Sequence, residues 1–537
     1  MTTKYWVGGD GNWSSVTNWR TTSGGAIVTT PPGSLDGAVL DANSGTSIVT
    51  VDSNITIQTL TCTGFTGTLA FGTNTISLNS TATVFIGATT MSVSGTPLII
   101  LNNATTTASR TINATAVTEA NSISFNITAG SGTASITVTG SGAIRDLNFT
   151  GFTGSHNATS YTMYGSLTLG TGMTVSAGST TTFAGAIAGT RTITTNSVTF
   201  DKNITFNSTA TLATDVIWQL NGALTSGNSR ACTLTAGTLD LNTNTLSIGQ
   251  FSSSNANVRT LAFGSNGYIT LTSASTTGNI TVFTTSDSTN FTVTGTDSYI
   301  GVSGGSSGFI RTFTPGLTTT GGTAATAISF YFYSGTDTIN LGTANRVFKD
   351  IKFSGFTGNI AANAAPYIYG DFFNNNSVTI TGGTNAWVFK ATSNVSILSL
   401  GRPINNPVIF DGIGGSWFIN DGTVVNDAVT LTNGTLKILS ETTFTVGSFA
   451  TSGTNQKYLQ STTAGVQATI SDASGVNSVS NLIIQDIAAT GGATWNAFYD
   501  LGNINNGNNT GWYFGDSPTV GNEITMRLRS FTQPRRF

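Results

Sequence analysis

Apolar and small polar residues alternate along most of this chain. In residues 54–62, 134–140, 233–241 and 279–283, hydrophobic side chains recur two positions apart. Successive side chains of a strand point to opposite faces, so this spacing predicts strands with one buried row and one outward row. Turn signals containing Gly and Asn follow at intervals of roughly 6 to 12 residues. No stretch has the period of an amphipathic helix, and the pattern predicts an all-β protein.

An eleven-residue segment with this alternation recurs. Its first copy reads Ile-Gln-Thr-Leu-Thr-Cys-Thr-Gly-Phe-Thr-Gly, and its first, fourth, sixth and ninth positions are apolar in the first three copies. Cys62 therefore takes the position of Phe149 and Phe353, and we expect Cys62 and Cys232 to be buried as small hydrophobic residues. The copies lie at residues 57–67, 144–154 and 348–358, with a looser one at 482–492.

Two further repeats accompany this segment. The second and third copies begin longer duplicated blocks, since a Tyr-Gly pair at 164–165 matches another at 369–370. A shorter element, Arg-Thr followed by an apolar residue, also returns several times. It begins at Arg110, Arg191, Arg259 and Arg311.

A strand unit that buries only one row of side chains must stack on copies of itself to make a core. The repeats therefore predict a parallel β-solenoid with coils of roughly 20 to 25 residues, and tandem β-sandwich domains are the alternative. We expect a Trp- and Gly-rich cap or attachment segment at 1–45, a solenoid at 46–490, and a cap with an Arg-rich tail at 491–537. The terminal segments are rich in aromatic residues, which suits the covering of open coil ends.

Charge is scarce in this chain. Only 8% of residues are charged and the net charge is −3, so the sequence lacks the basic field that nucleic-acid binding requires. No apolar run is long enough to cross a membrane and no secretory signal is visible, so we expect no membrane insertion and synthesis in a cytoplasm. The C-terminal tail is locally basic, and we expect it to be solvated or docked on a partner. Its arginines are Arg527, Arg529, Arg535 and Arg536.

Several motifs resemble those of phage and prophage virion proteins. They are the start Trp-x-Gly-Gly-x-Gly-Asn-Trp at 6–13 with Trp19 after it, the Gly-Phe-Thr-Gly and Arg-Thr-Ile elements, and an ending that contains Trp495 and Trp512. The resemblance implies a right-handed parallel β-helix of a tail fibre, head fibre or spike, displayed on the particle exterior. It also implies a homotrimer that contacts other virion proteins and a host glycan or receptor. Trp6, Trp13 and Trp19 are candidate partner-docking residues.

The residues that usually carry catalysis are few. His156 is the single histidine, and we expect it to be a polar loop residue. One histidine and two distant thiols make neither a zinc site nor a Cys/His dyad, so we expect no metal, no cofactor and no enzymatic activity. The only glutamates are Glu119, Glu441 and Glu523.

Two clusters are candidate glycan-binding or subunit-packing sites. In the alternating segment 330–333, Phe330 and Phe332 would fill the core while Tyr331 and Tyr333 project outward, where subunit packing is favoured over sugar stacking. The second cluster combines an aromatic residue with carboxylates, the groups that a glycan depolymerase uses. It consists of Asp411, Trp417 and Asp421.

Three functions remain open from the sequence. The favoured one is a structural, adhesive virion component. The second is a tailspike depolymerase, although aspartates in Gly- and Asn-rich turns ordinarily bond their own backbone. The third is a bacterial cell-surface adhesin.

Overall fold

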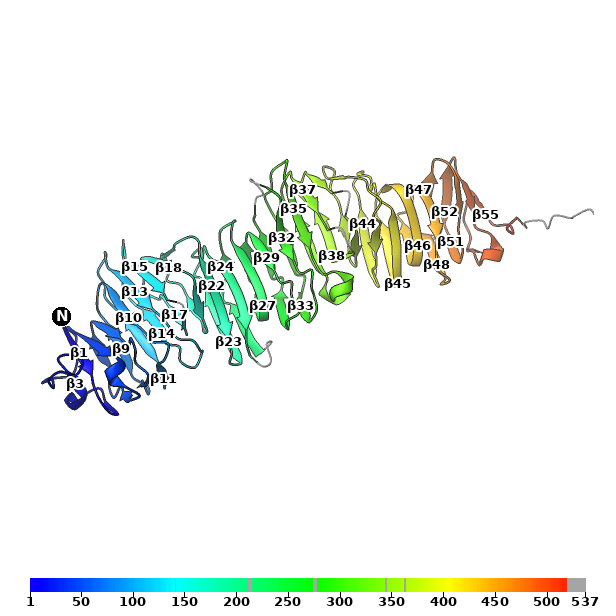
Figure 1. Ribbon diagram of the computed structural model, residues 1–537. Helices are drawn as coiled ribbons and strands as arrows, with labels where there is room; N and C mark the ends of the chain where they lie inside the picture. Colours follow the sequence, from blue (N-terminus) through cyan, green and yellow to red (C-terminus); the bar gives the residue numbers. More distant parts are fainter. Residues whose placement is uncertain (141, 211–214, 274–277, 343–344, 362–363, 519–537) are drawn as a thin grey trace, which may run out of the picture. The chain divides into compact units, whose positions relative to one another are not determined.

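The chain forms a β-solenoid of about 21 turns built from stacked parallel coils (Figure 1). The computed structural model describes residues 1–518 except 141, 211–214, 274–277, 343–344 and 362–363. The predicted all-β class and the stacking of parallel coils are confirmed, and the coils are not separate sandwich domains. Short 3-10 helices interrupt the strands at Val16–Asn18, Ala42–Ser44, Thr318–Thr320, Ala324–Thr326 and Tyr499–Leu501.

Each early coil contributes three short strands, and each strand pairs in parallel with its counterpart one coil later. The pairs are β4 with β7, β5 with β8, and β6 with β9. Side chains of equal register therefore stack into columns along the coils. The strands are β4 (Asp36–Leu40), β5 (Ile48–Thr50), β6 (Ile55–Ile57), β7 (Thr59–Thr61), β8 (Thr68–Ala70) and β9 (Thr75–Leu78).

Coil length varies along the stack. Hydrogen bonds between neighbouring coils join residues 20 to 22 positions apart around Asp146 and Asp350, as the sequence predicts. Between residues 256 and 320 they join residues 28 to 34 positions apart. In this region the strand pairing also shifts register, between Ala262 and Ser265 and between Thr281 and Phe283.

The eleven-residue repeat supplies the core. Its four apolar positions are buried in all three copies, including Cys62 at the position of Phe149 and Phe353. The final glycine is explained by packing, because a Cβ at Gly154 would lie 2.2 Å from the Ala134 carbonyl oxygen and 2.6 Å from the Phe152 ring. Gly67 and Gly358 meet the same obstruction from the preceding coil.

The Arg-Thr-apolar element places an arginine inside a corner of the solenoid. Arg259 donates hydrogen bonds to the carbonyl oxygens of Ser253, Asn257 and Thr289. Arg311 forms a buried ion pair with Asp337 at 2.6 Å. These cations satisfy backbone carbonyls that the corners leave without strand partners. The arginines at 110, 191, 259 and 311 are all buried.

Outward columns carry hydroxyl groups. One column passes through seven successive coils, and each member is partly exposed. Uncharged hydroxyls can stack at the strand spacing of about 4.8 Å without the repulsion that a column of like charges would create. The column consists of Thr162, Thr182, Thr205, Thr233, Ser252, Thr284 and Thr314.

The N-terminal end of the stack is closed. β1 (Thr2–Trp6) pairs in parallel with β4 on one side and antiparallel with β3 (Trp19–Arg20) on the other. The rings of Trp6 and Trp13 both pack edge-on against Trp19, and all three are buried. Residues 1–45 therefore cap the first coils and share their sheet.

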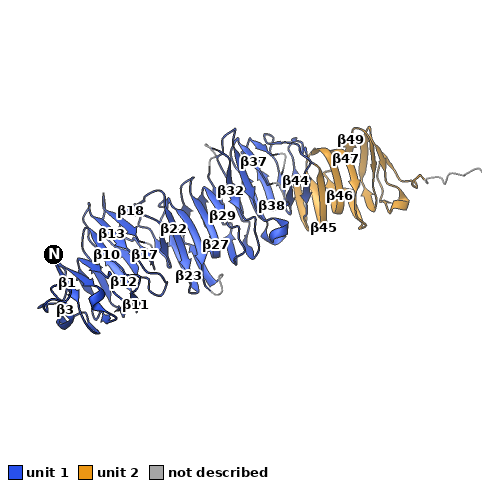
Figure 2. Ribbon diagram, viewed as in Figure 1, with its two compact units in different colours: residues 1–390, 398–406 blue, residues 391–397, 407–537 orange. Residues whose placement is uncertain are grey.

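The chain divides into two compact units (Figure 2). Unit 1 comprises residues 1–390 and 398–406, and unit 2 comprises 391–397 and 407–537. This division does not coincide with the predicted boundaries at 45 and 490. Within unit 2, long strands β45 (Val408–Ile419), β46 (Val424–Ile438) and β47 (Thr443–Thr451) pair in parallel. Its last three-stranded sheet contains β53 (Thr494–Asn496) and β55 (Trp512–Tyr513), with Trp495 against Trp512.

Candidate functional site

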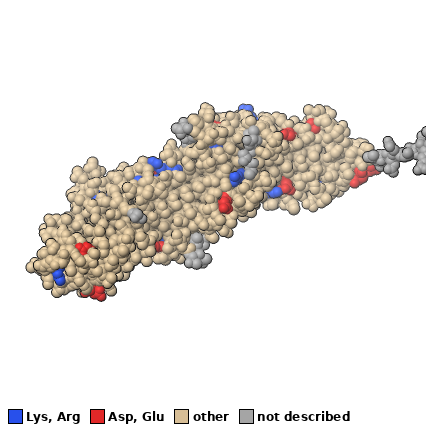
Figure 3. All heavy atoms as spheres, viewed as in Figure 1, with Lys and Arg blue, Asp and Glu red and all other residues tan. Residues whose placement is uncertain are grey.

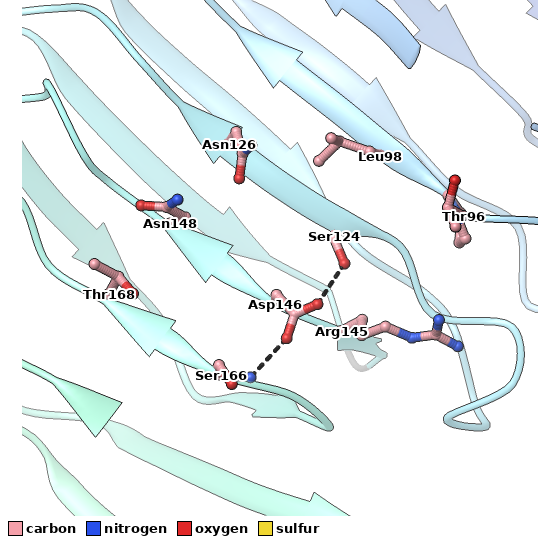
Figure 4. A pocket seen from close by; sticks show the side chains of 10 residues that line it. Thr96, Leu98, Ser124, Asn126, Arg145, Asp146, Asn148, Ser166 and Thr168 are labelled. Atoms are coloured by element: carbon pink, nitrogen blue, oxygen red, sulfur yellow. Dashed lines mark hydrogen bonds between the residues drawn. The ribbon is translucent and has the colours of Figure 1, made fainter. Parts of the chain in front are cut away.

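A polar groove lies over four neighbouring strands of unit 1 (Figure 4). Its volume is about 440 Å³, within the range of small-molecule sites. The lining is mostly hydroxyl and amide groups, with one arginine, one aspartate and the apolar Leu98. The strands are β12 (Leu98–Leu101), β14 (Ser124–Ile127), β17 (Leu147–Asn148) and β20 (Leu167–Thr168).

Asp146 joins three successive coils in this groove. One carboxylate oxygen accepts a hydrogen bond from the Ser124 hydroxyl at 2.7 Å, and the other accepts one from the Ser166 backbone N–H at 2.7 Å. A Cβ at Gly165 would lie 2.1 Å from the carboxylate, so only glycine allows this approach. This close approach of Asp146 explains the glycine of the repeated Tyr-Gly pair.

The third copy of the repeat builds the same three-coil contact. Asp350 accepts a hydrogen bond from the Ser329 hydroxyl at 2.6 Å and from the Asp371 backbone N–H at 2.7 Å. Gly370 takes the place of Gly165, with the same 2.1 Å approach to the carboxylate. We call these arrangements the aspartate staples.

A basic side chain precedes each aspartate staple. Arg145 lines the groove and donates one hydrogen bond, to the Glu119 carbonyl oxygen at 3.0 Å. Lys349 is exposed and lines a smaller recess of about 170 Å³ together with Ser329. Within the described part of the chain, neither cation forms an ion pair. The sequence reasoning missed both residues, although the Arg and Lys at one repeat position were a visible signal.

Three tyrosines stack on an outward face of unit 1. Tyr268 begins β31 (Tyr268–Leu271), Tyr299 begins β34 (Tyr299–Val302), and Tyr331 lies in β36 (Ile328–Phe332). The Tyr268 and Tyr299 ring centroids are 5.0 Å apart with planes 6° from parallel, and those of Tyr299 and Tyr331 are 4.5 Å apart at 12°. We call these three residues the tyrosine ladder. Tyr268 and Tyr299 were not singled out from the sequence, since their shared register emerges only from the stacking.

The predicted orientation of segment 330–333 is confirmed. Phe330 and Phe332 are buried, Tyr331 is partly exposed, and Tyr333 is 41% exposed. Tyr333 meets Tyr299 edge-on at 6.2 Å. Gly301 makes room for this contact, because a Cβ there would lie 3.0 Å from the Tyr333 ring. The three ladder rings cover one another's faces, so the adjacent Tyr333 presents more surface to a partner than any ladder residue.

Lys352 sits beside the tyrosine ladder. Its ammonium lies 5.3 Å from the Tyr331 ring centroid and 4.7 Å from that of Phe373, and it forms an ion pair with Asp371 at 3.0 Å. Burial opposes the charge of Lys352, but the Asp371 hydrogen bond and the nearby carboxylates outweigh it, so its pKa is raised. Burial also raises the pKa of Tyr331. The tyrosine ladder is an uncharged aromatic surface, and the adjacent Lys352 already forms an ion pair with Asp371.

The expected cluster around Trp417 is not a binding surface. The Trp417 side chain is completely buried and packs against Phe410 at 5.1 Å, so its prediction as a sugar- or subunit-contacting ring is wrong. Asp411 accepts a hydrogen bond from Asn433 at 2.7 Å, and Asp421 bonds the Thr423 hydroxyl. These aspartates hold neighbouring chain segments.

The other predicted residues fall into two groups. Trp6, Trp13 and Trp19 are inside the N-terminal cap, so the prediction that they dock a partner is wrong. Arg527, Arg529, Arg535 and Arg536 lie outside the described residues.

His156 is not the polar loop residue that the sequence suggested. It lies in β18 (Ser155–Ala158), is completely buried, and stands in register with the inward Ile136 of the preceding coil. Its Nε2 is 3.2 Å from the Tyr161 hydroxyl. Burial and the nearby Lys202 lower the pKa of His156 to about 3. The neutral imidazole is therefore a core side chain.

The described residues contain no group of three or more His, Cys, Asp or Glu side chains placed to hold a metal ion. Among the same residues, no helix has the length and apolarity to cross a membrane. Comparison of the chain with protein-family models, curated proteins and solved structures finds no match.

Proposed function

We propose that the protein is a structural, adhesive component of a bacteriophage virion, of the tail-fibre, head-fibre or spike type, and that it contacts the host surface without enzymatic activity. The observation that carries the proposal is the stack of parallel coils with an outward face of hydroxyl and amide groups. Each coil contacts its neighbours, so such a stack can display a long surface from one chain. The resemblance of several sequence motifs to those of phage virion proteins supports the virion context.

Charged side chains are sparse on the visible surface. On the face seen in Figure 3, they lie as isolated spots on a surface formed mostly by other residues. Contacts made by the uncharged part of this surface lose little strength when salt screens charges, so the few exposed cations are the places where a charged partner would be recognised. Several cations are buried in corners, where they hold carbonyl groups and carboxylates of the chain itself.

We further propose that the chain assembles as a homotrimer, with the tyrosine ladder and Tyr333 at the contact between subunits. Aromatic rings with a polar edge are common at protein interfaces. A mass measurement by light scattering should give three times the 55.2 kDa of one chain. Tyr333→Ser should lower the measured mass at micromolar concentration, whereas the outward Tyr458→Ser should not.

The location on the particle can be tested directly. An epitope tag at residue 1 would be labelled with gold-conjugated antibody on purified particles and viewed by electron microscopy. We expect gold on projections from the particle surface. If purified particles contain the structural proteins of the phage but no trace of this chain, the virion proposal fails.

The depolymerase alternative has its own test. Incubation of the protein with host polysaccharide should release no new reducing ends. Release of new reducing ends by the purified chain would replace the adhesive function by glycan cleavage.

A further inference from the structure

The groove of Figure 4 combines one unpaired cation with uncommitted amide groups. Arg145 uses one N–H group for the Glu119 carbonyl, and its guanidinium extends away from Asp146 in the view shown. Both Asp146 oxygens are occupied by donors from the coils on either side, so this carboxylate does not neutralise Arg145. A guanidinium offers five donors, so several remain for a ligand oxyanion.

The amides lie on neighbouring coils. Asn126 of β14 and Asn148 of β17 are paired in register, at the strand spacing of about 4.8 Å. The side-chain Oδ1 of Asn148 accepts hydrogen bonds from the Thr150 backbone N–H and hydroxyl, which leaves the NH₂ group of Asn148 for other partners. Leu98 adds an apolar surface at the edge of the groove. Amide donors beside an apolar contact suit a sugar ring, which has hydroxyl groups at its rim and C–H groups on its faces.

A basic side chain takes the same repeat position a second time, beside a smaller recess that contains no amide side chain. Lys349 follows Phe348 as Arg145 follows Ile144, and it lies in a recess with Ser329, whose hydroxyl is held by Asp350. In the first copy of the repeat the corresponding residue is Gln58, whose side-chain amide donates to the Ser34 carbonyl oxygen. The first copy thus has no charge at this position.

We infer that the Arg145 groove and the smaller Lys349 recess are two binding sites for an acidic saccharide, a sugar chain that carries oxyanions. This inference deepens the proposed contact with a host surface and rests on it for its biological setting. The basic side chain holds the oxyanion, and in the larger groove Asn126 and Asn148 hold sugar hydroxyls. Carboxylate and phosphate groups share this chemistry, and the test below separates them.

The test measures binding by the full chain in calorimetric titrations at low salt. The probes are a tetrasaccharide of galacturonic acid, the corresponding neutral tetrasaccharide of galactose, and a tetrasaccharide that carries phosphate. We expect two sites per chain for one or both acidic probes and none for the neutral probe. Binding of only one acidic probe identifies the oxyanion. Equal binding of the neutral probe, or no binding of either acidic probe, overturns the inference.

Variants assign the sites. Arg145→Gln and Lys349→Gln should each reduce the stoichiometry from two to one, with affinity at the changed site weakened by about tenfold or more, since a charge-assisted hydrogen bond is lost. The double variant should bind none. Arg145→Lys should retain the site. Arg402→Gln removes one charge of unit 1 outside both recesses and should leave two sites. Unchanged stoichiometry in the double variant overturns the inference.

Failure of the saccharide inference can be distinguished from failure of the virion proposal. Circular dichroism melting curves of every variant should match the parent. Retained binding by Arg145→Lys would show that a substitution at this position does not abolish binding by misfolding the groove. If particles carry the chain but it binds neither acidic probe, the saccharide inference alone fails. If both acidic sites titrate as expected but the chain is absent from particles, the virion proposal alone fails.

Discussion

The buried His156 makes the stability of the early coils depend on pH in a direction that can be worked out. Its pKa is about 3 in the folded chain against 6.5 when exposed. The folded chain holds His156 in its neutral form. The contribution of this residue to the stability of the fold is therefore complete above pH 6.5. Below that, the unfolded chain binds a proton that the folded chain does not, and stability falls by about 1.4 kcal/mol per pH unit. By pH 4.5 the loss is about 2.7 kcal/mol.

The assay must separate this effect from the titration of carboxylates. His156→Gln keeps a polar partner for Tyr161 but does not titrate. Hydrogen–deuterium exchange of peptides covering β18, corrected for intrinsic rates at pH 7.5 and 4.5, gives the free energy of local opening. Between the two pH values the parent should lose about 2.7 kcal/mol more than the variant.

The comparison has a clear failing result. If parent and variant lose the same protection between pH 7.5 and 4.5, His156 is not held neutral by burial, and the account of this core position is wrong. Lys202 is the nearby cation that adds to the shift, since it disfavours a second positive charge. In a background that carries Lys202→Met, the difference in lost protection between His156 and His156→Gln should therefore be smaller.

Three further outcomes are expected. Gly154→Ala should destabilise its coil by at least about 2 kcal/mol, because the new methyl group meets the backbone of the preceding coil. Gly33→Ala, where the methyl group would lie 3.9 Å from the Asp36 side chain, should cost little in the same melting experiment. Arg311→Met should cost about 3 to 5 kcal/mol by leaving Asp337 buried without its partner, and much less in a background that carries Asp337→Leu. Both thiols are completely buried and their pKa values are raised by that burial, so a thiol reagent should label neither in the folded chain and two per chain after denaturation.

The core of the repeats could be predicted from the sequence because local alternation specifies it. The inward position of Cys62 followed from its alignment with Phe149 and Phe353, and burial confirms it. The same reasoning failed for His156, since a polar residue after Gly-Phe-Thr-Gly was assigned to a loop. In the structure that segment is already the next strand, and Ser155-His-Asn-Ala continues the alternation with histidine inward.

Side-chain contacts between different coils could not be predicted from the local sequence pattern. Tyr268, Tyr299 and Tyr331 are about 30 residues apart, and only the coil length between them, which the corners set, brings their rings together. Trp417 shows the reverse error. A tryptophan near aspartates resembles a sugar site in the sequence, but the strand register turns its ring into the core.

The aspartate staples set a minimum size for growth of this protein by gene duplication. Each staple draws on three coils, with Ser124 before Asp146 and the Ser166 N–H after it. A duplication that copied one coil would leave a carboxylate without a donor or a donor without its carboxylate. The unit that can be inherited intact is the three-coil block, and the matching block at Asp350, with its own Ser329 and Gly370, is such a unit.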